Sequence, residues 1–312
     1  IGVKKILFLL ALVLILFSSC SLSEERFFEY DSNPFLKKEI ISKAKSDGLI
    51  SFSLYSDAHY NRDDSNCSWF DEEYKELLRE RRYSFAINIG DIADDGIITK
   101  EINKKVEEVR DLTEDNFVLV IRGNHDRHNK SPLWDSKNNN IYRSASAYYY
   151  GEKDNRPLLS IYNLDTSTKV IGEKQFSYLE EALKEDNAIY KIIVTHENVT
   201  TGSAISPSLV LFGLSSRECN KLYKLMSVYN IGLIIAGHNH IGHVSYHLTP
   251  TMGEINLAAF HKRKTNPIQY ESMGYVYDFT LNSKTGEAII TAIRIENKEK
   301  EEKYTFILPQ SK

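Results

Sequence analysis

Residues 117–126 read Phe-Val-Leu-Val-Ile-Arg-Gly-Asn-His-Asp, an apolar run that passes at once into a polar turn containing a glycine. Five consecutive apolar residues next to a turn predict a short strand that is buried on both faces, as in a sheet covered by helices. Four other segments share this pattern. With 117–121, the predicted strands are 49–56, 85–89, 191–194 and 232–236.

Helical patterns lie between these strands. In each of four segments the apolar side chains share one helix face. The four sets are Phe70, Tyr74, Leu77 and Leu78; Ile98, Ile102, Val106 and Val109; Phe176, Leu179 and Leu183; and Leu222, Leu225, Met226 and Tyr229. Ser215 and Glu218 predict a capping box at the start of the last helix. Alternating strands and helices over this length predict an α/β fold.

The last 70 residues have a different pattern. Apolar and polar residues alternate in segments that we interpret as antiparallel strands completing the same domain. These segments are 243–248, 254–260, 275–281, 288–295 and 304–308. We also expect a hairpin turn at 282–287, a short helix across 34–45, and two stretches that shape the pocket, 127–157 and 197–215.

A polar residue capable of binding metal closes each of the first five strands or follows it closely. These residues are Asp57, Asp91, Asn124, His196 and His238. Ligands of open α/β sheets gather outside the carboxyl ends of the strands, so the five side chains would converge if the strands are neighbours. A glycine precedes Asp91, Asn124 and His238, which fits sharp turns and a close approach of the backbone.

Composition excludes several classes of protein. The chain has 312 residues, of which 42% are hydrophobic and 26% charged, an ordinary globular balance. A formal net charge of −4 argues against a nucleic-acid-binding protein with a basic face, and nothing in the sequence indicates sequence-specific nucleic-acid binding. Three cysteines without a C-x-x-C spacing indicate neither a disulfide framework nor a thiolate metal site.

The strand ends form an ordered set of motifs. In chain order the motifs are Asp57-Ala-His59, Gly90-Asp91-x-x-Asp94, Gly123-Asn124-His125-Asp126, His196 and Gly237-His238-Asn-His240. This set resembles the calcineurin-like metallophosphoesterases. The resemblance implies a single catalytic domain at 49–312, a metallophosphoesterase-like β-sandwich flanked by helices in α/β/β/α layers.

The resemblance also implies two divalent metal ions. Imidazole, carboxylate and amide donors without thiolate suit Mn, Zn, Fe, Ni or Co. By resemblance, one ion is held by Asp57, His59, Asp91 and His240. The second is held by Asp91, Asn124, His196 and His238, so that Asp91 bridges the pair. Residues two apart on a strand point the same way, which would let both members of each Asp-x-His or His-x-His pair face the site.

The implied activity is the hydrolysis of a phosphodiester or a phosphomonoester by a metal-bridging hydroxide. His125 would be the general acid, and Asp126 would orient its ring. Asp94 would support either the loop of Asp91 or the outer surroundings of the metal ligands. The partner would be a small phosphate ester or a phosphorylated headgroup. A phosphoprotein phosphatase and a non-catalytic lipoprotein that binds a phosphate ligand are the alternatives. Arg122 and Arg127 flank the acid motif and are either phosphate clamps or exposed charges.

The first twenty residues form a separate segment. Lys4 and Lys5 precede an apolar run at 6–17, followed by Ser18-Ser19-Cys20. The run is shorter than the roughly 20 residues of a membrane-spanning helix and is typical of a secretory signal. Its end resembles the lipobox of bacterial lipoproteins. We therefore expect a signal peptide at 1–19, lipidation of Cys20, a spacer at 20–48, and anchoring to a membrane face of the bacterial envelope outside the cytoplasm. An ordinary signal peptide cut nearby is the alternative.

Overall fold

The structure is a computed structural model of the chain. It describes residues 39–40, 48–60, 67–94, 97, 99–126, 141–142, 146–153, 156–200, 213–240, 244–260 and 274–311. The chain divides into two units, Ile1–Pro34 and Phe35–Lys312, and all described residues belong to the second. The predicted signal peptide, Cys20 and most of the predicted spacer lie outside the described residues.

Two seven-stranded sheets make up the second unit. The first sheet has the order β14-β13-β12-β2-β3-β4-β5, and the second has the order β1-β6-β7-β8-β9-β11-β10. The strands of the first sheet are β2 (Leu49–Tyr55), β3 (Phe85–Asn88), β4 (Val118–Val120), β5 (Ile141–Tyr142), β12 (Tyr275–Asn282), β13 (Glu287–Arg294) and β14 (Glu299–Ile307). Those of the second are β1 (Glu39–Ile40), β6 (Ser146–Lys153), β7 (Arg156–Leu164), β8 (Tyr190–Thr195), β9 (Leu233–Ala236), β10 (Val244–Thr249) and β11 (Met252–Asn256).

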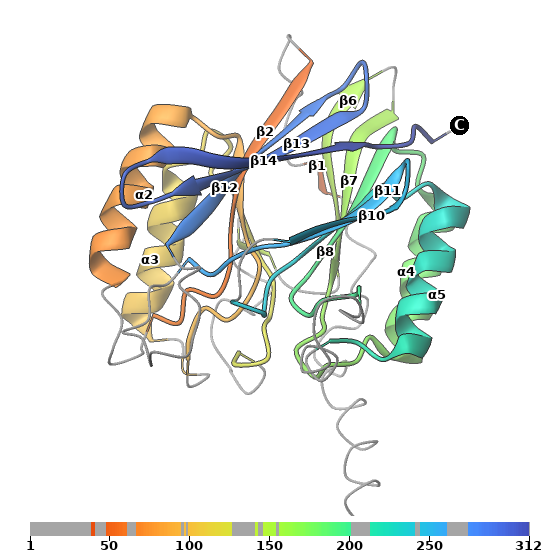
Figure 1. Cartoon of the computed structure of the whole chain (residues 1–312), viewed down its shortest axis with the longest axis horizontal. Helices are drawn as coiled ribbons and strands as arrows, with labels where there is room; N and C mark the ends of the chain where they lie inside the picture. The colour runs from red at the N-terminus through yellow and green to blue at the C-terminus, as the bar shows by residue number, and fades with distance from the viewer. Residues whose placement is uncertain are drawn as a thin grey trace, which may run out of the picture. The chain divides into compact units, whose positions relative to one another are not determined.

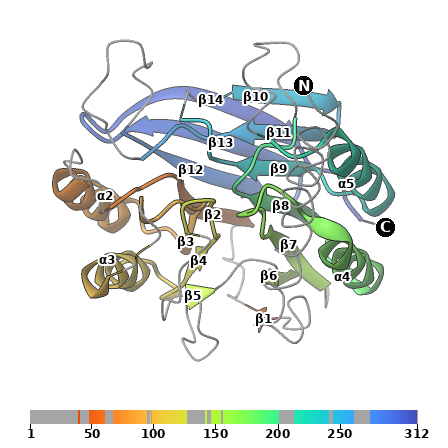
Figure 2. The same cartoon turned by 90° about the horizontal axis from the view of Figure 1, so that it is seen from below.

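Four helices cover the outer faces of the two sheets. Figures 1 and 2 show α2 and α3 against the first sheet and α4 and α5 against the second. The helices are α2 (Cys67–Arg81), α3 (Lys100–Asp111), α4 (Gly172–Glu185) and α5 (Ser216–Tyr229). The layers are thus α/β/β/α, as the family resemblance implied. None of the described helices is long and apolar enough to cross a membrane.

The core lies between the two sheets. Alternate side chains of β2, Ile50, Phe52 and Leu54, point into it, whereas the Ser53 hydroxyl accepts a hydrogen bond from Tyr74 of α2 at 3.0 Å. Phe52 stacks on Phe85 of β3 and on Phe279 of β12, with ring centroids 4.6 and 4.2 Å apart. Two further cores lie under the helix pairs, so each sheet is buried on both faces. This explains the unbroken apolar runs of the sequence.

Strand direction brings the site residues together at the carboxyl ends of the parallel strands in each sheet. β2, β3 and β4 run parallel to one another, and so do β7, β8 and β9. The five strands that carry the motifs are therefore split, three in the first sheet and two in the second. The condition that we set for convergence, that all five strands are neighbours, is not met, because the strands belong to two sheets. A sequence pattern shows that a strand is buried without showing which strand it pairs with.

Two other expectations need correction. The segment 34–45 contains a strand, because Glu39 and Ile40 pair in parallel with Tyr148 and Tyr149 of β6; the helix expected there is wrong at these residues. The stretch 127–157, expected to shape the pocket, includes β6 and the start of β7, which form an antiparallel hairpin. The capping box is half confirmed, because Ser215 Oγ accepts the N–H of Glu218 but the Glu218 carboxylate binds the N–H groups of Ile171 and Gly172 at the start of α4.

Candidate dinuclear metal centre

The loops that follow the motif strands are joined by main-chain hydrogen bonds. The N–H groups of Asp57 and His59 donate to the carbonyls of Gly90 and Asp91, at 3.0 and 2.9 Å. The N–H of Gly237 donates to the carbonyl of His196 at 3.1 Å. The loops after β2 and β3 are thus one rigid unit, and the loops after β8 and β9 are another.

Five predicted ligands have left-handed backbone conformations. Their φ angles are 57° for Asp57, 44° for His59, 50° for Asp91, 73° for His238 and 54° for His240. Such conformations cost on the order of 1–3 kcal/mol each in non-glycine residues and persist where the surroundings enforce them. The members of each pair face the site because of these turns beyond the strand ends. The strand alternation that we expected is not the reason.

Glycines allow the loops to approach each other. A Cβ on Gly123 would overlap the carboxylate of Asp91, and a Cβ on Gly90, whose φ is +94°, would lie 2.6 Å from Nδ1 of His196. Both contacts are far inside van der Waals distance. The predicted close approach of the backbone is therefore confirmed at these two glycines.

The first cluster contains Asp57, His59, Asp91 and His240. Nε2 of His240 lies 2.9 Å from Oδ1 of Asp57 and 3.2 Å from Nε2 of His59. Oδ2 of Asp91 lies 3.8 Å from Nε2 of His59. One donor atom from each of the four residues falls within 4.8 Å of the others, and three of the four side chains are buried.

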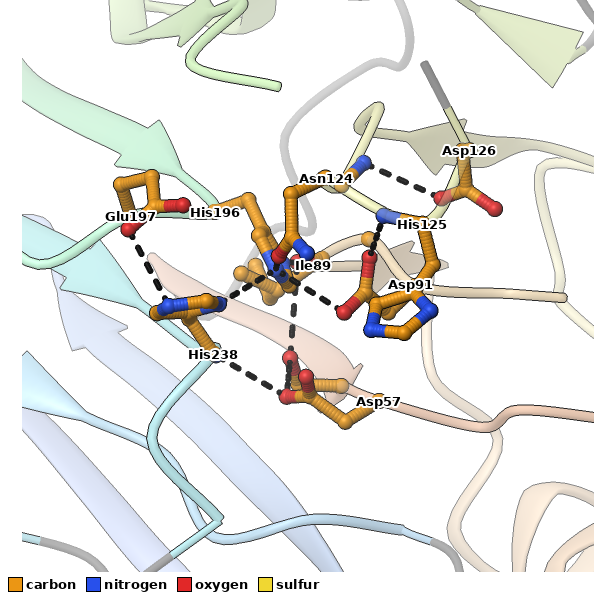
Figure 3. Close-up of polar contacts among 12 residues, drawn as sticks. Asp57, Ile89, Asp91, Asn124, His125, Asp126, His196, Glu197 and His238 are labelled. Carbon is orange, nitrogen blue, oxygen red and sulfur yellow. Dashed lines mark hydrogen bonds and ion pairs between the residues drawn. The ribbon is translucent and has the colours of Figure 1, made fainter. Parts of the chain in front are cut away.

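The second cluster contains Asp91, Asn124, His196 and His238. Nε2 of His196 lies 3.2 Å from Oδ2 of Asp91, 3.1 Å from Oδ1 of Asn124 and 3.3 Å from Nδ1 of His238. Nδ1 of His196 donates to the carbonyl of Ile89 at 2.7 Å, so its Nε2 is the atom that faces Asp91 (Figure 3). The structure thus brings together all seven predicted ligands, with Asp91 shared by both clusters.

The chemistry of the donors fits a pair of divalent cations. In each cluster two imidazole nitrogens face each other at 3.2–3.3 Å beside a buried carboxylate. A divalent cation placed between the two nitrogens would attract both of them and the carboxylates as well. Nitrogen and oxygen donors of this kind suit Zn, Mn, Fe, Co or Ni.

The pKa values of three residues in the second cluster are shifted by burial and by their charged neighbours. Burial raises the pKa of the Asp91 carboxyl, but His196 outweighs burial and brings this pKa down to about 2. Burial lowers the pKa of His196, but Asp91 outweighs burial and raises it to about 10. Burial and the charge of His196 lower the pKa of His238 to about 3. Before metal binds, the site therefore holds an ionised carboxylate beside an imidazolium, with His238 neutral and able to donate a lone pair.

Comparison with known proteins decides the family. A sequence model of the calcineurin-like phosphoesterases matches residues 51–242, more than half of the chain. The chain belongs to the calcineurin-like phosphoesterase family. No curated protein matches it.

Solved structures share the fold of this phosphoesterase at low sequence identity. The Plasmodium protein GAP50, described as the anchor in the inner membrane complex, matches with a TM-score of 0.60 and 16% identity over 85% of this chain and 90% of its own. A dimetal phosphatase from Danio rerio matches with a TM-score of 0.56 and 13% identity, over 83% of this chain and 99% of its own. A purple acid phosphatase from yellow lupin matches with a TM-score of 0.55 and 10% identity, over 86% of this chain and 55% of its own. Identities this low show the fold alone.

The predicted acid, His125, lies at the edge of the phosphoesterase site. Its main-chain N–H donates to Oδ1 of Asp91 at 2.8 Å, which holds the loop against the shared carboxylate. Nδ1 of the ring lies 2.5 Å from the main-chain carbonyl of Asp94 and 3.7 Å from Oδ1 of the same residue. The side chain is 39% exposed, so a bound molecule can reach it.

Asp126 does not orient the ring of His125, and that expectation is wrong. Its carboxylate accepts the N–H groups of Ile92, Ala93 and Gly123 at 3.0–3.2 Å and so ties the loop after β3 to the loop after β4. In Figure 3 the Asp126 carboxylate lies apart from the ring of His125. Burial and the nearby Asp91 raise the pKa of Asp126 to about 7. Asp94 is the residue that contacts Nδ1 of His125.

Sequence reasoning missed Glu197. This residue follows His196 directly, and its side chain is fully buried, with Oε2 3.3 Å from Nε2 of His238. Burial raises the pKa of its carboxyl to about 7. The available signal was a charged residue placed next to a predicted ligand, immediately after a strand of buried apolar residues.

Arg122 lies close to Asp165, which follows β7, with Nη1 3.6 Å from Oδ2, and both side chains are mostly buried. The interpretation of Arg122 as an exposed charge is therefore wrong. Arg127 lies outside the described residues.

Proposed function

We propose that this protein is a dinuclear, metal-dependent phosphoesterase that hydrolyses a phosphodiester or a phosphomonoester. The observation that supports this best is the pair of donor clusters that share Asp91, each with two facing imidazole nitrogens. Two divalent cations held there would polarise water and the phosphoryl oxygens of a bound ester. Family membership supports the reaction class.

The chain's own residues have distinct parts in this proposal. Asp57, His59, Asp91 and His240 would hold one ion, and Asp91, Asn124, His196 and His238 would hold the other. Asn124 donates an amide oxygen without adding a further negative charge where an anionic ester must bind. The hydrogen bonds between the loops hold the strained backbone of the ligands, and with it the donors, in place before metal arrives.

His125 would protonate the leaving oxygen. Donation of its Nδ1–H to the carbonyl of Asp94 leaves Nε2 as the atom that carries the transferable proton. Its partial exposure lets it approach a leaving group, while the bond from its N–H to Asp91 keeps it near the metal ions. Asp126 would act indirectly, by fixing the two loops that carry Asp91 and His125.

A non-catalytic role is the second candidate. The GAP50 neighbour is described as an anchor, and a related fold in this chain could capture a phosphate ligand without hydrolysing it. The complete set of donors and the accessible His125 favour catalysis. A phosphoprotein phosphatase remains the alternative among enzymes.

The site of action that we propose is the bacterial envelope. A lipidated Cys20 would tether the domain to a membrane face outside the cytoplasm, where small phosphate esters and lipid headgroups are available. This part of the proposal rests on the sequence of residues 1–20 alone.

The test is metal-dependent turnover. Purified protein is stripped of metal, reloaded with Mn, Zn, Ni, Co or Fe, and assayed with bis-p-nitrophenyl phosphate and p-nitrophenyl phosphate. We expect hydrolysis after reloading, a loss of at least about 100-fold in His238→Ala, and little change in His247→Ala, a matched control on β10. Two bound ions without turnover of either ester, or of a phosphopeptide, would favour the non-catalytic role.

A further inference from the structure

Glu197 is a buried acid held rigidly beside the second cluster. Its side chain has no exposed surface, and its main-chain N–H donates to Oγ1 of Thr166 at 3.0 Å. That hydroxyl also meets Oγ1 of Thr195 at 2.9 Å, which joins the end of β8 to the loop after β7. The backbone of Glu197 is thus tied to the end of β8 and to the loop after β7, and its side chain is enclosed by protein.

The imidazole of His238 contacts this carboxylate. Oε2 lies 3.3 Å from Nε2 of His238, within ion-pair distance, and neither carboxylate oxygen has an aligned hydrogen bond in the described part of the structure. An ionised carboxylate without a partner in the protein interior is strongly unfavourable. The contact with His238, together with the charges of His196 and Lys169, can account for an acid at this position.

The imidazole of His238 lies between Glu197 and the cluster. Its Nδ1 is 3.3 Å from Nε2 of His196, while its Nε2 faces Glu197 (Figure 3). An ionised carboxylate has no hydrogen to donate, so it can only accept a hydrogen bond from the ring. Nε2 must then carry the hydrogen, and Nδ1 keeps its lone pair toward His196 and Asp91.

We propose that Glu197 is a positioning residue for the second metal ion, which accepts Nε2–H of His238 and so fixes the tautomer that directs Nδ1 at that ion. This inference rests on the dinuclear centre of the proposed function. The tautomer of His196 is fixed by a different acceptor, because its Nδ1–H is donated to the neutral main-chain carbonyl of Ile89. An imidazole that donates to a carboxylate is a more basic metal ligand than one that donates to a carbonyl. His238 would therefore bind the second ion more tightly than His196 does.

The experiment measures metal binding and needs no turnover. Metal-free protein is titrated with Co²⁺ by calorimetry, the bound ions are counted by elemental analysis, and the visible spectrum of Co²⁺ reports the coordination of each ion. Glu197→Gln is compared with the wild type and with Glu185→Gln, an exposed control at the end of α4. Thermal unfolding of the metal-free variants checks the fold, and Glu197→Asp serves as the second variant if Glu197→Gln does not fold.

We expect two ions in the wild type and in Glu185→Gln. In Glu197→Gln one of the two dissociation constants should rise by about 10–100-fold, as for other loss of an outer partner of a ligating histidine. In a His238→Ala background, Glu197→Gln should change nothing further, because the two residues act as a unit.

Three results would overturn the inference. These are unchanged binding of both ions in Glu197→Gln, the same weakening with and without His238, and fewer than two ions in the wild type at saturating metal. If the wild type binds two ions but hydrolyses neither ester, the proposed function fails, while the comparison of Glu197 variants still decides the inference.

Discussion

Oδ1 of Asp94 lies 3.0 Å from Nδ1 of His59, on the side of the ring opposite to Nε2, which faces His240 at 3.2 Å. The main-chain carbonyl of Asp94 lies 2.5 Å from Nδ1 of His125. One residue therefore contacts both a proposed ligand of the first ion and the proposed acid. The side chain acts on the ligand and the main chain acts on the acid, so a side-chain substitution separates the two roles.

Asp94→Asn should weaken the binding of one ion. An amide in place of the carboxylate removes the negative charge that stabilises Nδ1–H of His59. The dissociation constant of the ion that His59 binds should therefore rise by about 10–100-fold. The carbonyl that holds His125 is unchanged, so the rate at saturating metal should fall much less than metal affinity does. Calorimetric titration and initial rates at high metal check this. Equal loss of affinity in the exposed control Asp111→Asn would mean that the effect is only one of net charge.

His125→Ala should separate metal binding from catalysis. The ligands are untouched, so we expect both ions to remain bound. Loss of the acid should slow alkyl phosphate esters by about 10²–10⁴-fold, and p-nitrophenyl esters much less, because p-nitrophenolate leaves without protonation. Rates with both kinds of ester, together with metal counts, are the measurement. Equal slowing of the two would argue against an acid role.

Phe52→Ala should be strongly destabilising. Phe52 is fully buried between the rings of Phe85 and Phe279 at the centre of the core between the sheets. Its removal leaves a cavity, and we expect the free energy of unfolding to fall by about 3–5 kcal/mol. Urea unfolding of the metal-free protein gives this value. Leu49→Ala, at the exposed start of the same strand, is the control and should cost well under half as much.

Glu254 should make stability depend on pH. Burial raises the pKa of this carboxyl above its ordinary value of 4.5, although hydrogen bonds from Thr200 and from the N–H of Val199 oppose the shift. The folded state then binds the proton more tightly than the unfolded state does. The contribution of Glu254 to stability is fully present below pH 4.5 and is lost as the pH rises through the raised pKa.

Glu254→Gln removes this titration. Relative to the wild type, the variant should therefore gain free energy of unfolding as the pH rises from 4 to 8. Unfolding by urea at several pH values, with metal-free protein, measures the difference. Parallel curves for the two proteins would contradict the assignment, whatever the offset between them.

Much of the fold and of the site could be predicted from local sequence. The apolar runs before Asp57, Asp91 and Asn124 are strands because a helix-covered sheet buries both of their faces. The positions directly after strand ends predicted five of the converging side chains, and the family resemblance implied the full set. What spacing could not give is strand pairing: which sheet a buried strand joins depends on contacts between distant residues.

The parts that were wrong depend on three-dimensional contacts. Asp126 follows His125 in sequence, yet its carboxylate turns back to three main-chain N–H groups, and Asp94, 31 residues away, contacts the ring. The role proposed for Glu197 depends on the loop after β9, which places His238 in contact with its carboxylate. The left-handed backbone of the ligands is likewise invisible in a pattern, because residues such as Asp and His adopt it only where their neighbours enforce it.

The central claim is that one carboxylate, Asp91, is shared by two metal ions. Crystals of the reloaded protein, measured on both sides of the metal's absorption edge, test it most directly by anomalous scattering. We expect two peaks about 3.5–4 Å apart, one on each side of the Asp91 carboxylate, and neither peak at full height in Asp91→Ala. A single peak in the wild type, or two peaks that both persist in Asp91→Ala, would contradict the account.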